Sequence, residues 1–353
     1  MSDRMLLYAL CFALALLPVL LFLLTLVTLD SYKLVRFRVV VALVGWGGLS
    51  ALVCLFLNPA LERSLGVSFE SYSRYVAPLI EELVKGAAIM IAISRRRVGF
   101  LVDGAIWGFA VGTGFAAVEN IHYFLVVAEP NPTLWAIRGF GTAVMHGGAT
   151  AILAVVSKLF TESRDSVAPH LFLPGYLVAA AIHALYNQFF LSPNESTLIV
   201  LVVLPLVFVL TFWASERATQ DWIGAGFDTD QELLTVMKLG KLSETRVGDY
   251  LSQLRSRFAP ECIADMLCLI RLHVELSIKA KGMLIMRKAG FSPPPDPSVE
   301  ADFRELEYLQ ESIGRTGLIA LRPIFHTNSR DLWKLYMLRQ EAAPARRQSR
   351  VAE

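Results

Sequence analysis

Seven apolar runs constrain this chain more than any other feature of its sequence. Each is long enough to cross the hydrocarbon core of a bilayer, which takes about 20 residues of helix. They cover residues 5–29, 38–57, 75–94, 99–127, 134–160, 171–191 and 196–214. The 353 residues are 55% hydrophobic and 18% charged, which is typical of a polytopic membrane protein with a soluble part. We therefore predict an all-α fold with about seven transmembrane helices in residues 1–214.

The connections between these runs are short and carry turn signals. These signals are Asn58-Pro59, Pro130-Asn131-Pro132, Pro169 and Ser192-Pro193-Asn194. The run 5–29 is too long for the apolar part of a signal peptide and lacks a small-x-small cleavage site, so we expect it to remain as a membrane helix. The net charge of +2 gives no reason to expect nucleic acid as a partner. The spacing of the four cysteines predicts free thiols.

Basic residues gather in alternate loops, and this pattern predicts the orientation of the chain. Loops 30–37 and 95–98 are rich in lysine and arginine, and Lys158 and Arg164 lie around the end of the fifth run. Cytoplasmic loops carry such an excess of positive charge. The N-terminus is therefore expected outside the cytoplasm and the C-terminal region inside it.

After residue 214 the sequence becomes charged and helical in pattern. We predict a helical cytoplasmic domain over 215–341, which offers a surface for a regulatory partner or for self-association, and a disordered tail over 342–353. The apolar spacing indicates helices near 229–239, 243–257, 260–288, 298–313 and 329–340. No catalytic motif is present in this region.

Three ionisable residues lie close together inside the third apolar run. Glu81, Glu82 and Lys85 fall within an arc of about 100° on a helix, with Lys85 between the two acids. Each such residue costs about 2.5–3.5 kcal/mol in a bilayer, so intramembrane charges generally mark a functional site. Lys85 can neutralise only one acid, which leaves the second to be protonated, bound to a metal or catalytically poised.

Other membrane runs place ionisable residues at a similar depth. A rise of 1.5 Å per residue puts Glu81 about 10 Å and Glu119 about 14 Å below the outer ends of their helices. The same estimate puts His146 about 16 Å and His183 about 14 Å down. Gly104, Gly108 and Gly112, spaced four residues apart, allow the close helix packing that would bring Glu119 and His146 together. We predict one site formed from four helices, in the outer half of the bilayer.

These residues form an ordered set of motifs: Glu81-Glu82-x-x-Lys85, Phe115-x-x-x-Glu119-Asn120, His146 and His183-x-x-x-Asn187. The set resembles the PrsW family of glutamic-type intramembrane proteases, which are related to type II CAAX prenyl endopeptidases and to bacteriocin-immunity membrane proteins. The resemblance covers a core of about 70–195. Glu119 stands where the CAAX enzymes have histidine, and Asn187 stands where aspartate is frequent in PrsW relatives. The resemblance implies a multi-pass protein of a bacterial inner membrane that cleaves membrane-anchored proteins such as anti-sigma factors, without a cofactor.

The resulting hypothesis is peptide hydrolysis near the extracytoplasmic face by glutamate-activated water. Glu81 is the preferred general base, with Glu82 and Lys85 setting its charge. Glu119 and His146 would complete the water site, and Phe115 and Asn120 would support it. We expect His183 and Asn187 to stabilise the tetrahedral oxyanion.

Two alternatives remain open from the sequence. Glu81, Glu119, His146 and His183 could hold zinc, which would make the enzyme a metalloprotease. The intramembrane acids could instead serve a proton- or ion-coupled transporter, or a membrane signalling protein with a protease-like core that does not catalyse. Inverted repeats or broken helices would favour a transporter, and the sequence shows neither.

Overall fold

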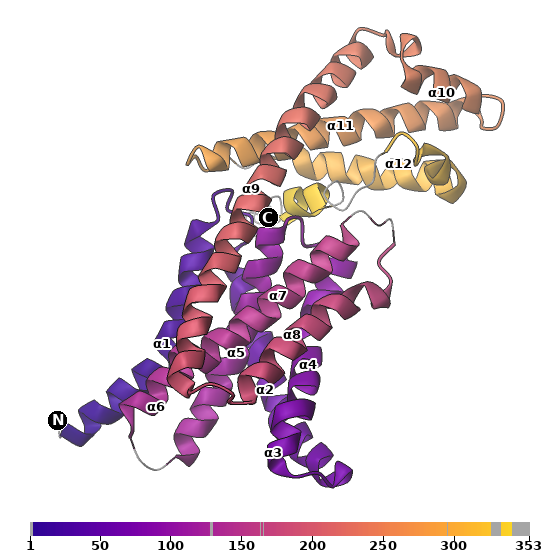
Figure 1. Ribbon diagram of the computed structural model, residues 1–353. Coiled ribbons are helices and arrows are strands. Elements are labelled where there is room, and N and C mark those ends of the chain that lie inside the picture. The colour runs from indigo at the N-terminus through magenta and orange to yellow at the C-terminus, as the bar shows by residue number, and fades with distance from the viewer. Residues whose placement is uncertain are drawn as a thin grey trace, which may run out of the picture. The chain divides into compact units, whose positions relative to one another are not determined.

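A computed structural model describes residues 3–127, 130–162, 164, 166–294, 296–325 and 333–340 (Figure 1). Every regular element among them is a helix. The chain divides into two compact units, Met1–Glu216 and Arg217–Glu353. The predicted disordered tail, 342–353, lies outside the described residues.

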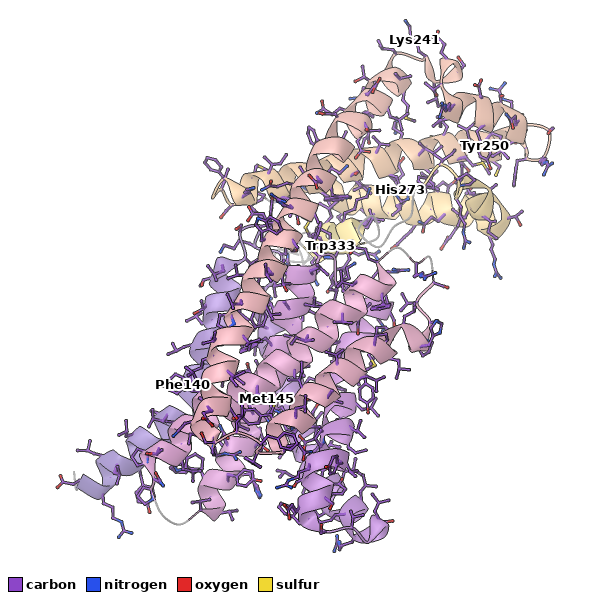
Figure 2. All side chains as sticks on the ribbon, in the orientation of Figure 1. Phe140, Met145, Lys241, Tyr250, His273 and Trp333 are labelled. Carbon is purple, nitrogen blue, oxygen red and sulfur yellow. The ribbon has the colours of Figure 1, made fainter. Side chains whose placement is uncertain are left out.

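The first unit contains the predicted membrane runs as helices. They are α1 (Asp3–Leu29), α2 (Phe37–Leu65), α3 (Phe69–Ser71), η1 (Tyr72–Val76), α4 (Ala77–Ser94), α5 (Leu101–Val126), α6 (Pro132–Ala136), η2 (Ile137–Ala143), α7 (Val144–Thr161), η3 (Pro169–Phe172), α8 (Leu173–Asn187) and the first part of α9 (Pro193–Lys238). Of these, η1 and η2 are π-helical and η3 is a 3₁₀-helix. Large apolar side chains are exposed along α1, α2 and α9, as a lipid environment requires (Figure 2).

Five helical stretches among the described residues are long and apolar enough to cross a membrane. They are α1, α2, α5, the continuous stretch Pro132–Thr161 and α9. The third and sixth predicted spans correspond to α4 and α8. α4 carries three ionisable residues in 18 positions, and α8 has only 15 residues, so neither is a simple apolar span. A multi-pass membrane protein is therefore established, while a count of seven spans stays a prediction.

One predicted turn is wrong. Asn58-Pro59 does not end the second helix, because α2 continues to Leu65 and ends at Gly66, which has a φ of +65°. Proline removes one helical hydrogen bond, but membrane helices tolerate this when their surroundings satisfy the freed carbonyl group. Asn58 consequently lies on a helix instead of in a loop.

Helix α5 is the centre of the first unit and packs mainly against α2 and α7. A methyl group added at Gly108 or Gly112 would overlap the main chain of α7 near Thr150 or His146. The absence of a side chain at both positions therefore sets the distance between these helices. The predicted close approach of the two glycine-rich helices is confirmed at these positions.

The second unit is a helical bundle. It contains the rest of α9, η4 (Leu242–Glu244), α10 (Arg246–Leu254), α11 (Pro260–Lys288), α12 (Ser298–Leu321) and a helix over 333–340. α11 packs against α12, and its buried side includes Met266, Leu269 and Leu276. The predicted helix over 229–239 is part of the longer α9.

Candidate active site

Glu82 lies at the centre of a buried polar cluster, and both of its carboxylate oxygens are engaged. The side chains of Glu82 and Lys85 are both fully buried, and Oε1 lies 2.5 Å from Nζ of Lys85. The same oxygen lies 3.0 Å from Nδ1 of His183 on α8. Oε2 accepts a hydrogen bond from the hydroxyl of Thr150 on α7, at 3.2 Å. Glu82 therefore joins α4, α7 and α8.

The contact with Glu82 fixes the orientation of His183. An ionised carboxylate only accepts hydrogen bonds, so Nδ1 of His183 must donate the proton. Nε2 then points toward Glu81, with its nitrogen 3.8 Å from Oε2 of that residue. A carboxylate that holds the far nitrogen of a histidine is the usual arrangement behind a metal ligand or a catalytic base.

Glu81 is held differently from its neighbour. Its Oε1 accepts a hydrogen bond of 2.9 Å from the side-chain amide of Asn58 on α2. Asn58 in turn accepts a hydrogen bond of 3.0 Å from the hydroxyl of Tyr72, at the start of η1. Lys85 therefore pairs directly with Glu82, whereas the direct donor to Glu81 is a neutral amide.

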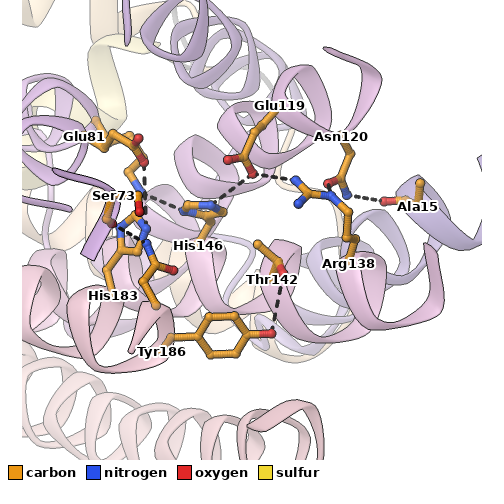
Figure 3. A network of polar contacts seen from close by, with 12 residues as sticks. Ala15, Ser73, Glu81, Glu119, Asn120, Arg138, Thr142, His146, His183 and Tyr186 are labelled. Carbon is orange, nitrogen blue, oxygen red and sulfur yellow. Dashed lines mark hydrogen bonds and ion pairs between the residues drawn. The ribbon is translucent and has the colours of Figure 1, made fainter. Parts of the chain in front are cut away.

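His146 lies between two charged groups (Figure 3). Its Nδ1 is 3.2 Å from Nζ of Lys85, and its Nε2 is 3.3 Å from Oε2 of Glu119. An ammonium group has only donors, so Nδ1 accepts and the neutral ring carries its proton on Nε2, toward Glu119. The ring packs against Phe115 and meets the ring of His183 edge to face.

The outer part of the network connects Glu119 to Arg138, which lies in the π-helix η2. NH2 of Arg138 is 3.1 Å from Oε2 of Glu119, and Nε donates to the side-chain oxygen of Asn120 at 2.9 Å. The amide nitrogen of Asn120 donates to the carbonyl of Ala15 on α1. Asn120 thus ties α1, α5 and η2 together.

The two remaining predicted residues are Phe115 and Asn187. Phe115 is buried and its ring faces Nζ of Lys85, at 4.6 Å from the ring centre. The amide nitrogen of Asn187 donates to the carbonyl of Ser73 in η1, at 3.0 Å. This bond holds α8 against η1, so the oxyanion role of Asn187 stays a prediction.

Four residues of the network were not identified from the sequence: Asn58, Tyr72, Arg138 and Thr150. Asn58 was assigned to a turn, and Tyr72 precedes the predicted span. Thr150 lies one helical turn after His146, and that spacing is the one local signal that could have identified it. Tyr72 lies in η1 and Arg138 in η2, and π-helices often occur at functional sites. The periodicity of apolar residues does not distinguish a π-helix from an α-helix over so few residues.

The chemistry of the cluster fits a divalent metal. One ligand atom from each of Glu81, His146 and His183 lies within 4.8 Å of the others. Two histidines and one glutamate form a ligand set that catalytic zinc takes in other enzymes. Glu82 would hold His183 in place, whereas His146 would have to release Lys85 or Glu119. Of the four ligands predicted from the sequence, Glu119 is absent from this group and instead pairs with Arg138.

Comparison with known proteins identifies a family for this chain. A family model described as "PrsW family intramembrane metalloprotease" matches residues 36–214, which is about half of the chain and includes all the helices from α2 to α8. No curated protein and no solved structure matches the chain. On the strength of the family match, this chain belongs to the PrsW family of intramembrane proteases.

Proposed function

We propose that this protein hydrolyses peptide bonds of membrane-anchored proteins with water activated at Glu81. The observation that carries this proposal is the convergence of Glu81, His146 and His183 in a buried cluster whose other glutamates already have cationic partners. Oε2 of Glu81 faces His183 and is the oxygen available to accept a proton from water.

The neighbouring groups have separable roles in this mechanism. Glu82 holds His183 through Nδ1, so that Nε2 faces the reacting region. When His183 carries a second proton, Nε2 can donate a hydrogen bond to the developing oxyanion. Glu119 and His146 form the opposite wall, and Arg138 supports them from η2.

A metal-dependent form of the same function is favoured by the ligand set. Glu81, His146 and His183 would hold the ion. Zinc bound in such a site polarises a carbonyl group and lowers the pKa of water. In both forms Glu81 and His183 are indispensable, and the two forms differ in their response to a chelator.

The orientation expected from the basic loops places the site in the outer half of the bilayer, with the C-terminal unit in the cytoplasm. Cleavage near the extracytoplasmic face suits a single-span regulatory protein, such as an anti-sigma factor, in a bacterial inner membrane. The helical C-terminal unit would then be available to a cytoplasmic regulator or to a second copy.

The test is cleavage of a single-span reporter protein in liposomes. Glu81→Gln and His183→Ala should each lower kcat by about 10²- to 10⁴-fold, the usual contribution of a general acid or base. Glu70→Gln is the matched control, because Glu70 is an exposed acid that pairs with Arg74. Wild-type turnover by both site variants would refute the proposal and leave the transporter or signalling alternatives.

Measuring cleavage after treatment with a chelator distinguishes the two mechanisms. Loss of cleavage after chelation, with recovery on adding zinc, would identify a metalloprotease. Unchanged cleavage after a chelator has removed all measurable metal would identify a glutamate mechanism without metal.

A further inference from the structure

Asn58 and Tyr72 form a short hydrogen-bonded chain that ends on Glu81. Tyr72 is 2% exposed and lies in η1, while Asn58 lies on α2. The hydroxyl of Tyr72 is 3.0 Å from Oδ1 of Asn58, and Nδ2 of Asn58 is 2.9 Å from Oε1 of Glu81. The chain thus links η1, α2 and α4.

The carboxylate at one end of this chain determines which group donates each hydrogen bond. The carboxylate of Glu81 can only accept when ionised, so the amide of Asn58 must present its nitrogen to it. The amide oxygen then faces Tyr72, whose hydroxyl donates. Without that hydroxyl, the amide could rotate by half a turn and present its oxygen to Glu81, which would be repulsive.

We propose that Asn58 and Tyr72 are a positioning pair, which occupies Oε1 of Glu81 and leaves Oε2 as the reacting oxygen. This inference deepens the proposed function and rests on it. Oε2 lies 3.8 Å from Nε2 of His183. The pair leaves Oε2 of Glu81 as the reacting oxygen in both mechanisms, as a proton acceptor or as a metal ligand.

The continuation of α2 past Pro59 is what makes this pair possible. A turn at Asn58 would have carried its side chain away from α4. Because the helix extends to Leu65, Asn58 lies on the helical surface that packs against α4. Tyr72 reaches the same amide from η1, which directly precedes α4 in the chain.

The experiment measures kcat and KM of the full chain in liposomes for Asn58→Leu, Tyr72→Phe and the double variant. Partners that orient a reacting group are typically worth about 10- to 100-fold, so Asn58→Leu should lower kcat by about that factor with KM nearly unchanged. Tyr72→Phe should have a smaller effect in the same direction. The double variant should be no slower than Asn58→Leu, because Tyr72 acts through Asn58.

Two further variants separate positioning from folding. Asn58→Asp keeps size and shape but replaces the donor with a carboxylate, so it should be at least as slow as Asn58→Leu. Tyr75→Phe removes a hydroxyl from the same π-helix at a residue that is 61% exposed, and it should match wild type. A loss caused only by misfolding would lower the amount of active enzyme in the Asn58 variants and leave kcat per active enzyme unchanged.

The inference is overturned if Asn58→Leu and Tyr72→Phe both keep wild-type kcat, or if their effects multiply in the double variant. Glu81→Gln, measured in parallel, shows which idea has failed. An inactive Glu81→Gln beside a fully active Asn58→Leu removes the positioning pair and leaves the proposed function intact. A fully active Glu81→Gln removes both.

Discussion

Replacement of Lys85 by methionine should destabilise the first unit strongly. The side chains of Lys85 and Glu82 are both fully buried and their charged atoms are 2.5 Å apart. Removing one partner of a buried ion pair costs about 3–5 kcal/mol, because the other charge remains buried. In a domain of about 200 residues, each kcal/mol shifts Tm by about 2–4 °C, so the expected loss is about 6–20 °C.

The double variant Glu82→Gln, Lys85→Met separates stability from activity. It removes both charges and should recover most of the lost Tm, because a neutral replacement of a buried pair is often tolerated. Cleavage should not recover, since an amide orients His183 less firmly than a carboxylate does. Thermal unfolding in detergent and the liposome assay give the two readouts. A wild-type Tm for Lys85→Met, or wild-type cleavage by the double variant, would refute this account of Glu82.

Two other predictions follow from packing and from titration. Gly112→Ala should lower both Tm and cleavage, because the added methyl group would overlap the main chain of α7. Gly45→Ala is the control, because a methyl group there has no neighbouring atom within 4 Å, and it should leave both unchanged. In the second unit, burial and the nearby Lys334 lower the pKa of His273 from 6.5 to about 4. As the pH falls, the unfolded chain therefore protonates His273 at a higher pH than the folded chain does. The free energy of unfolding should fall by up to about 3 kcal/mol as the pH drops from 6.5 to 4. Hydrogen exchange in α11 at neutral pH and at about pH 4.5 measures this loss, and His273→Leu should remove it; an equal loss in that variant would contradict the assignment. His273 is labelled in Figure 2 and packs against Phe325.

The sequence predicted the helices of the first unit well because hydrophobicity is a local signal. The apolar runs correspond to α1, α2, α4, α5, the continuous stretch from α6 through η2 to α7, α8 and the first part of α9, within a few residues at most ends. The clear failure was Asn58-Pro59, where a turn signal valid in water was applied to a helix in a membrane. Local residue preference cannot show whether neighbouring helices satisfy the carbonyl group that a proline frees.

The sequence identified most residues of the site, but it did not predict which of them contact one another. Depth along each helix brought Glu81, His146 and His183 to one level, and the structure places their ligand atoms together. Which acid pairs with Lys85 depends on how α4 is rotated against α7 and α8, and spacing within one helix carries no such information. Arg138 was not identified from the sequence, although it lies on η2 and reaches Glu119 from there.

The direct partners of the three glutamates are the reason why we propose Glu81 as the centre of the chemistry. Glu82 pairs with Lys85, and Glu119 pairs with Arg138, so two of the three negative charges are matched by full positive charges. Glu81 receives a hydrogen bond from a neutral amide, and its other carboxylate oxygen lies 3.8 Å from Nε2 of a histidine. A buried carboxylate with an unmatched charge gains most from a proton or a divalent cation. A glutamate-activated water and a bound metal would therefore both be drawn to the same oxygen, so a single variant at Glu81 tests them together and only the chelator separates them.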